Sequence, residues 1–378
     1  MIPRLFARDA TTFTSMGICP LSDAVSCTVT EERNGQYTLE MVYPVSGQWF
    51  SEIKVDRIIL AQAHESDTHP QPFRIESIEG DIGPTITINA VHISYQLNWI
   101  VAARQTIASG TAQTNMRAVG LLNGVIGQST CPFSFYSDIT GSHTMELTAP
   151  VSFRSFLGGV EGGFLDVYGG EFEWDIWDVH LWASRGEDNG VRITYGKNLT
   201  GIDWSTDVSD TYTDVYAYWM QDNEGTVTYK GSTVQTIGGD FAFQRLIAVD
   251  ASGEWQSEPS SSQLNSYASN YVKANAQYPT VSVSIDFVPL WQTEEYKEYA
   301  AFEKVGLCDA VTIVYPPLNL ELKAQVVKTV YNVFLDRYDS IEIKTVKKSL
   351  ADTIFAMEKQ IRRTSIKVGR VEKPLPRM

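Results

Sequence analysis

Hydrophobic and polar residues alternate along the N-terminal part of the chain, a pattern typical of half-buried β-strands. Apolar residues fill every second position of 25–29, and the alternation resumes after Asn34-Gly35. A two-residue turn would put the two apolar rows on opposite faces of the hairpin, so burial of one face requires an extra loop residue. We therefore predict a three-residue loop that pairs Val29 with Leu39 and holds Gly35 as a left-handed bulge.

Three further segments of the same kind follow the hairpin. Residues 55–61, 72–78 and 85–94 are rich in β-branched and aromatic residues and are separated by turn-forming sequences. Consecutive strands of this length favour a meander. We therefore predict that residues 1–97 form a small β-barrel or sandwich.

Helical spacing appears only in short segments. Apolar residues recur at helical intervals over 115–126, and Ser152 precedes a second short apolar stretch that ends at Gly158-Gly159. A serine before the first turn and a glycine after the last are typical helix boundaries. We predict two short helices, at 115–126 and 152–157, within a small mixed insertion.

Strand patterns return in the second half of the chain. The alternation that starts at Phe172 changes phase at Ile176-Trp177, which indicates a bulge or a strand buried on both faces. The turn sequence 185–190 precedes another alternating run, so we predict a further hairpin ending near Tyr195. The β-branched run that starts at Lys323 favours a strand, although a helix is also compatible with it.

The predicted fold class is therefore mainly β, with two β-barrel-like domains and small mixed α+β insertions. The proposed division is an N-terminal β-barrel domain at 1–97, a mixed helical insertion at 98–170, a second β-barrel domain built from 171–240 and 280–346, an insertion with a helix at 241–279, and a basic C-terminal helix and tail at 347–378.

Composition fits a folded protein and restricts its partners. Of 378 residues, 43% are hydrophobic and 20% are charged. No apolar run has the roughly 20 residues that a membrane span needs, and the first residues lack the apolar core of a signal peptide. The 45 acidic and 30 basic residues give a net charge of −15, which disfavours specific nucleic-acid binding.

The charge is unevenly distributed. Residues 344–378 contain ten Lys/Arg and three Asp/Glu, whereas the rest of the chain is strongly acidic. Within this tail, four apolar residues fall on one face of a predicted helix at 349–361, next to two arginines. A basic amphipathic helix is a candidate for docking a partner, although it could equally pack on its own domain or be a solvated terminus. The docking candidates are Leu350, Ile354, Met357, Ile361, Arg362 and Arg363.

The search for reactive chemistry finds no convincing catalytic site and no cofactor motif. Four scattered cysteines predict reduced thiols rather than a disulfide scaffold. The best metal candidate combines two imidazoles and two carboxylates, although such a polar run is also typical of a solvated loop. Its residues are His64, Glu65, Asp67 and His69.

Four tryptophans could stack on sugars or fill a β core. They are Trp174, Trp177, Trp182 and Trp204.

Six short segments carry a resemblance to a known family. They are the hairpin sequence 31–40, Pro72-Phe73-Arg74-Ile75, Ala90-Val91-His92-Ile93-Ser94-Tyr95, Gly169-Gly170-Glu171-Phe172, the run 185–199, and 327–343 with Asp336-Arg337-Tyr338. In this order, over about residues 20–345, they resemble the N-terminal structural region of phage tail-associated proteins, also described as phage minor structural protein or prophage tail endopeptidase.

The resemblance implies a baseplate hub at the tip of a phage, prophage or tailocin tail, assembled in the host cytoplasm. Such hubs form a homotrimeric ring that continues and closes the tail tube, contacts the distal tail protein ring and the tape-measure protein, and opens to pass DNA. A fibre, spike or receptor-binding protein could attach through the basic C-terminal tail. Many relatives continue into a cell-wall hydrolase; we expect that domain to be absent here and therefore expect no peptidase activity. A tail-tip hydrolase and a carbohydrate-binding receptor protein are the alternatives.

Overall fold

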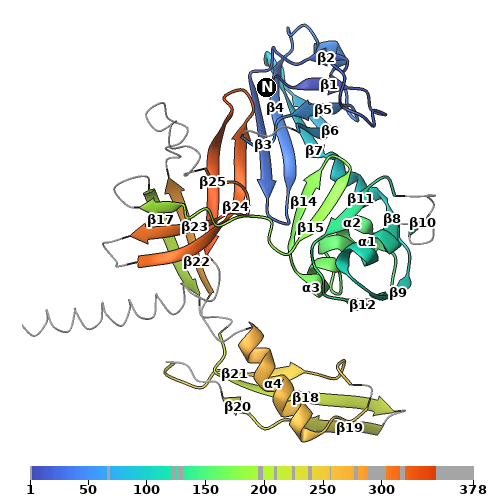
Figure 1. Ribbon diagram of the computed structural model, residues 1–378, viewed down its shortest axis with the longest axis vertical. Coiled ribbons are helices and arrows are strands. Elements are labelled where there is room, and N and C mark those ends of the chain that lie inside the picture. The colour runs from blue at the N-terminus through green and yellow to red at the C-terminus, as the bar shows by residue number, and fades with distance from the viewer. Residues whose placement is uncertain are drawn as a thin grey trace, which may run out of the picture. The chain divides into compact units, whose positions relative to one another are not determined.

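The computed structural model describes residues 2–65, 69–120, 125–126, 131–194, 199–207, 211–223, 226–236, 241–255, 257–275, 280–287, 304–315 and 320–345. They form mainly β-strands with a few short helices (Figure 1). The prediction of a mainly β chain with mixed insertions is confirmed, and none of the sheets in these ranges closes into a barrel.

The chain forms two compact units. The first contains residues 1–200, 286–312 and 324–343, and the second contains 201–285, 313–323 and 344–378. The domain boundaries proposed from the sequence remain a prediction. No described helix is long and apolar enough to cross a membrane.

An 11-stranded sheet is the largest element of the fold. Its order is β16-β23-β24-β3-β4-β7-β6-β5-β1-β2, with β25 beside β24. The strands are β1 (Arg4–Phe6), β2 (Cys19–Pro20), β3 (Ser26–Glu32), β4 (Tyr37–Pro44), β5 (Ile58–Ala61), β6 (Gln71–Gly80), β7 (Thr85–His92), β16 (Arg192–Thr194), β23 (Ala310–Tyr315), β24 (Leu320–Asn332) and β25 (Arg337–Thr345). Two 3₁₀ turns, η1 (Phe50–Glu52) and η2 (Ile93–Trp99), follow β4 and β7.

The β3–β4 hairpin has the register that its apolar rows require. Val29 pairs with Leu39, and residues 33–35 form the predicted three-residue loop. The left-handed residue, however, is Asn34, with φ of 55°, and not Gly35. Asn is one of the few side chains that tolerate this conformation. Its amide also donates to Gly170 O at 3.0 Å, a long-range bond that no local pattern reveals.

A mixed insertion follows η2, and it contains short strands and three helices. The elements are β8 (Val101–Ala102), β9 (Gln105–Gly110), α1 (Ala112–Gly120), β10 (Val125–Ile126), β11 (Ser134–Ser137), β12 (His143–Leu147), β13 (Val151–Ser152), α2 (Phe153–Gly158) and α3 (Phe164–Tyr168). Ser152 caps α2 as predicted, because its hydroxyl accepts from the Ser155 N–H. The other helix prediction was wrong at both ends: α1 begins before 115 and ends at Gly120, and Val125-Ile126 is a strand.

Two predictions between residues 171 and 195 were also wrong. β14 (Glu171–Asp175) and β15 (Asp178–Trp182) form a hairpin, and the phase change at Ile176 is its turn, with φ of 52°, rather than a bulge. The run after the 185–190 turn forms β16, but this strand pairs with β23 and not with its sequence neighbour β15. Pairing with a strand more than a hundred residues away is favoured by tertiary packing, which local alternation cannot report.

The second unit contains an α/β module with its own core. The module consists of β18 (Asp214–Asn223), β19 (Thr226–Gly231), β20 (Gln235–Thr236), β21 (Leu246–Asp250) and α4 (Ser261–Asn275). Helix α4 lies across one face of the sheet (Figure 1) and packs Leu264 and Ala268 against Val215, Ala217 and Trp219. A separate pair, β17 (Leu199–Asp207) and β22 (Thr280–Phe287), also belongs mainly to this unit.

The strand predicted from Lys323 onward is confirmed as part of β24, and the helix predicted within the insertion at 241–279 is α4. The amphipathic helix predicted at 349–361 lies outside the described residues.

Candidate functional site

A buried polar cluster centred on Glu31 lies in the first unit. The carboxylate on β3 is 2% exposed, Arg185 Nη1 donates to its Oε1 at 2.6 Å, and His64 Nε2 lies 2.8 Å from Oε2. Burial alone would raise the pKa of Glu31, but the charges and hydrogen bonds of Arg185 and His64 outweigh it and lower the pKa to about 2. This carboxylate is therefore a fixed charge that joins distant segments, not a group suited to proton transfer near neutral pH.

Glu171 extends the cluster toward β24. Its Oε2 accepts from the Arg185 backbone N–H at 2.8 Å, and its Oε1 accepts from Gln325 Nε2 at 2.7 Å. Gln325 also donates to the Cys308 carbonyl at 2.8 Å. These bonds satisfy polar groups at the meeting point of β3, β14 and β24, which is a structural role.

The residues predicted as metal ligands do not come together as a metal site in the described part of the chain. His64 contacts Glu31, and Glu65 Oε1 lies 3.4 Å from Lys304 Nζ. The backbone carbonyl of His69 accepts from Gln71, and Asp67 lies outside the described residues. Among the residues that the structure describes, no group of three or more His, Cys, Asp or Glu is arranged to hold a metal ion.

His92, at the end of β7, is fully buried beside this cluster. Its Nδ1 accepts from the Ser94 N–H, which leaves the Nε2 proton to be donated to Gln71 Oε1 at 3.2 Å. The ring stacks on Tyr37, with centroids 4.5 Å apart. Burial lowers the pKa of His92 to about 3, and the charge of Arg154 adds to the effect against the opposing influence of Glu31. The imidazole is therefore neutral and serves as a hydrogen-bonded core residue.

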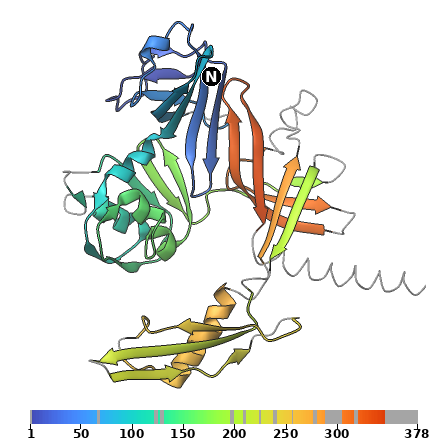
Figure 2. The same ribbon diagram turned by 180° about the vertical axis from the view of Figure 1, so that it is seen from behind.

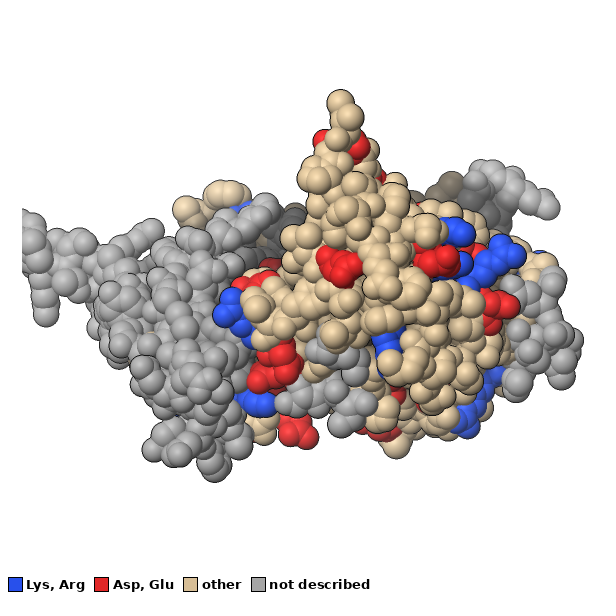
Figure 3. Space-filling view, turned by 90° about the horizontal axis from the view of Figure 1, so that it is seen from above, with Lys and Arg blue, Asp and Glu red and all other residues tan. Residues whose placement is uncertain are grey.

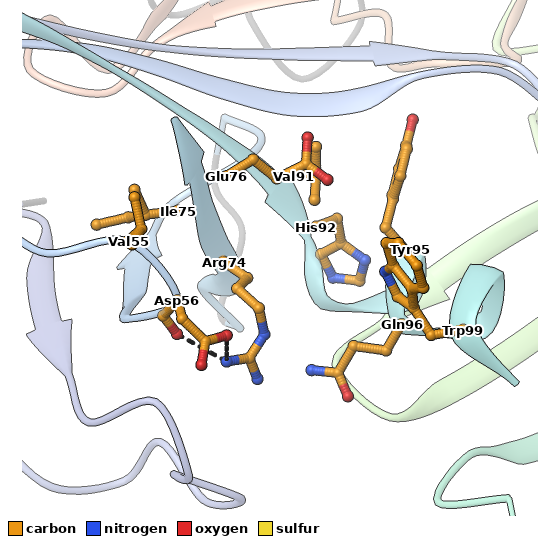
Figure 4. A pocket seen from close by; sticks show the side chains of 10 residues that line it. All are labelled: Val55, Asp56, Arg74, Ile75, Glu76, Val91, His92, Tyr95, Gln96 and Trp99. Carbon is orange, nitrogen blue, oxygen red and sulfur yellow. Dashed lines mark hydrogen bonds and ion pairs between the residues drawn. The ribbon is translucent and has the colours of Figure 1, made fainter. Parts of the chain in front are cut away.

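An open pocket of about 410 Å³ lies over β6, β7 and η2 (Figure 4). The Arg74 guanidinium lines this pocket and is held by several hydrogen bonds. Its Nη1 donates to Asp56 Oδ1 at 3.0 Å and to the carbonyls of Asp56 and Arg8. The Gln96 carboxamide, oriented with its oxygen toward the guanidinium, accepts from Arg74 Nη2 at 2.7 Å and Nε at 3.2 Å. Figure 4 shows Asp56, Arg74 and Gln96 along one side of the hollow and Glu76 on the other, with Trp99 beside Gln96.

Two backbone irregularities border the same pocket. Asp56 has a left-handed φ of 71°. Glu76 is an extra residue in β6, because Ile75 pairs with Ala90 and Ser77 pairs with the adjacent Asn89. Bulges of this kind redirect a side chain and are common next to functional sites. The indole of Trp99, at the end of η2, is 82% exposed.

Three of the four tryptophans considered from the sequence as sugar platforms have contacts within the fold. Trp174 is buried, with the Arg154 guanidinium 4.5 Å from its ring centroid. Trp177 donates from its indole to the Thr11 carbonyl, and Trp182 donates to Glu173. Nothing is described of the Trp204 side chain. Among the tryptophans whose side chains the structure describes, Trp99 is the exposed one. Its exposure could not be predicted from the sequence, because a short turn has no periodic pattern of apolar residues.

The α4 module exposes a sheet face of mainly aromatic and aliphatic residues, with the exposed Asp250 beside Tyr218 on the edge strand β21. Because alternate residues of a strand point to opposite sides, the β18 residues between those that pack on α4 point to the other face of the sheet. Figure 2 views the ribbon from the side opposite to Figure 1. The register pairs Met220 with Tyr229 and Asp222 with Val227. Val227 is 61% exposed and Tyr229 is 54% exposed. We call this surface the outer face; it consists of Tyr216, Tyr218, Met220, Val227, Tyr229 and Leu246.

Charge does not mark a further site on the face drawn in Figure 3. Acidic and basic side chains of the described residues lie interspersed there, without a continuous patch of either sign. The six docking candidates predicted from the basic tail, Leu350 to Arg363, lie outside the described residues.

Comparison with known proteins defines the class to which this fold corresponds. Residues 187–354 match the family model described as prophage endopeptidase tail. The resemblance predicted from the sequence is thus confirmed over this segment. A search among curated proteins finds no match.

Solved structures extend the likeness to almost the whole chain. The prophage tail protein gp18 from Listeria monocytogenes has 15% identity and a TM-score of 0.56, over 96% of this chain and 100% of that one. A 43 kDa tail protein of prophage MuSo2 from Shewanella oneidensis has 9% identity and a TM-score of 0.57, over 93% and 99% of the two chains. A tail protein from Neisseria meningitidis has 7% identity and a TM-score of 0.53, over 93% and 98%. The fold is that of prophage tail proteins.

Proposed function

We propose that this protein is a structural hub at the distal end of a phage-like tail and that three copies form a ring continuous with the tail tube. The observation that supports the proposal most strongly is the likeness to solved prophage tail proteins over more than nine tenths of the chain. The match of residues 187–354 to a prophage tail family supports it independently of the structure.

The outer face supplies a surface for assembly in this proposal. Soluble monomers rarely expose a continuous apolar patch unless it binds something. In a closed ring, each copy presents this surface to a neighbouring copy, so that the exposed Val227 and Tyr229 become buried. The distal tail ring, the tape-measure protein and a fibre or spike are the further partners that the proposal includes.

The net charge of −15 suits a conduit for DNA. Carboxylates around a channel repel the phosphate backbone, so DNA passes without lasting contacts. In this role the protein works by assembly rather than catalysis. The Glu31 cluster is consistent with that role, since its charged groups bind one another.

Electron microscopy of the purified chain tests this proposal. We expect rings with threefold symmetry and a central opening. The double variant Val227→Lys and Tyr229→Lys should disperse them, because charges would be buried at each contact. Ile82→Lys is the matched control, since Ile82 is fully exposed in the first unit and outside the outer face. Single particles without a ring, both alone and with a distal tail ring, would refute the hub.

A further inference from the structure

The pocket between Asp56, Glu76 and Trp99 has features of a binding site that the hub function does not require. A left-handed aspartate, a bulged glutamate and an exposed tryptophan occur on three separate segments and border one hollow. The left-handed conformation and the bulge are unfavourable for the backbone, and an exposed tryptophan contributes little to the stability of the fold. Their convergence favours selection for a ligand.

The aromatic part of the pocket fits a flat, partly apolar ligand. The Trp99 indole is 82% exposed, while Tyr95 lines the pocket from the same turn. A tryptophan combines a large apolar face with a polar edge, and such rings are favoured where one side of a ligand is apolar and the other is wet. The C–H face of a pyranose ring has this character.

The polar part fits vicinal hydroxyl groups. Asp56 and Glu76 present carboxylate oxygens, and the Gln96 amide presents its NH₂ group once its oxygen binds Arg74. Arg74 holds Asp56 and Gln96 in place, so these groups are positioned before a ligand arrives. Small-molecule sites combine an aromatic wall with a few fixed polar groups in this way, and 410 Å³ falls within their usual volume.

Charge selects against an anionic ligand. Two carboxylates face the hollow with one guanidinium, and Asp56 and Gln96 already engage that guanidinium. A phosphate or sulfate group would meet net negative charge without a free cation in the lining. We propose that the pocket binds uncharged sugar units of an oligosaccharide, with Trp99 as the stacking platform and Asp56, Glu76 and Gln96 as hydroxyl partners.

This proposal goes beyond the hub function and does not depend on ring formation. A ring-forming protein that ignores sugars would refute the pocket alone. A sugar-binding monomer would refute the hub alone.

Calorimetric titration of the full chain tests the proposal. The probes are chitotetraose, maltotetraose, and galactose- and rhamnose-based oligosaccharides, with dextran sulfate as the anionic comparison. We expect saturable binding of at least one neutral oligosaccharide and none of dextran sulfate. Trp99→Ala should weaken that binding about tenfold or more, as removal of a central aromatic contact usually does. Trp99→Phe should retain part of it.

Phe243→Ala is the matched control. Phe243 is an exposed aromatic residue of the second unit and does not line this pocket, so its removal should leave sugar affinity unchanged. Glu76→Ala should weaken binding more than Glu76→Gln, which keeps a hydrogen-bonding group.

Absence of saturable binding for every neutral probe would overturn the proposal. Equal affinity of Trp99→Ala and the unaltered chain would also overturn it, as would burial of Trp99 in the ring, which indicates a protein contact.

Discussion

The β3–β7 part of the large sheet and the α4 module show two ways of completing a fold. The large sheet buries its apolar residues and its charged cluster, so that even Glu31 is 2% exposed and bonded by Arg185 and His64. The module buries one face of its sheet under α4 and leaves the other face apolar and exposed. The comparison therefore separates a region that buries its own apolar residues from one that leaves an apolar surface, which the proposed ring would cover.

The largest expected effect removes the core of the module. Trp219→Ala should destabilise the module by about 3–5 kcal/mol, because the indole is buried against α4 and donates to the Trp255 carbonyl at 3.0 Å. Hydrogen exchange should speed up across β18–β21 while β3–β7 remains protected. Equal acceleration in both regions would show that they unfold as one unit. Trp219→Phe, which keeps most of the ring volume, should have a smaller effect.

A comparable but smaller effect is expected when the buried cluster loses its main cation. Arg185→Met should destabilise the protein by about 3 kcal/mol at neutral pH, because Glu31 stays buried without its strongest partner. Urea unfolding measures this change. Arg33→Met is the matched control: Arg33 is more exposed and lies 3.5 Å from Glu171, so its loss should cost about 1 kcal/mol or less. Similar losses for the two variants would contradict the role given to Arg185.

Acid should weaken the first region in two stages. The pKa of His92 is lowered from 6.5 to about 3, so its contribution to stability is complete above pH 6.5 and is lost as the pH falls toward 3. The pKa of Glu31 is lowered from 4.5 to about 2, which adds a second loss below pH 4.5. Each group contributes a slope of about 1.4 kcal/mol per pH unit in its window.

Stability of His92→Gln measured between pH 6 and 5 isolates the first stage. The variant should lack the slope that His92 contributes there, whatever its absolute stability. A slope identical to that of the unaltered chain would show that His92 is not responsible.

The smallest expected effect on stability comes from the outer face. Val227→Lys should change the free energy of unfolding by only about 0.5 kcal/mol, because the side chain is already exposed in the single chain. It should nevertheless reduce self-association at a given concentration. A large loss of stability without loss of association would show that the outer face packs within the chain.

Local patterns predicted the parts of the fold that local physics determines. The β3–β4 register followed from the need to bury one face, and the α2 boundary followed from the Ser152 cap. The pairing of β16 with β23 could not be predicted, because it depends on contacts between distant segments. The left-handed conformation of Asn34 could not be predicted for the same reason, because its amide donates to the carbonyl of the distant Gly170.

The candidate sites were less accessible from sequence. The charged run at 64–69 suggested a metal, but a single distant carboxylate, Glu31, engages His64. The pocket at Trp99 depends on a bulge at Glu76 and a left-handed Asp56, and neither feature produces a recognisable spacing. The resemblance to a known family suggested the proposed assembly role more directly than any residue pattern did.

The solution mass, measured by light scattering after size exclusion over a range of concentrations, tests the central claim most directly. The account predicts about 127 kDa, the mass of three 42.2 kDa chains, and a lower mass for Val227→Lys at the same concentration. A constant mass of about 42 kDa, unchanged by mixing with a distal tail ring, would contradict it.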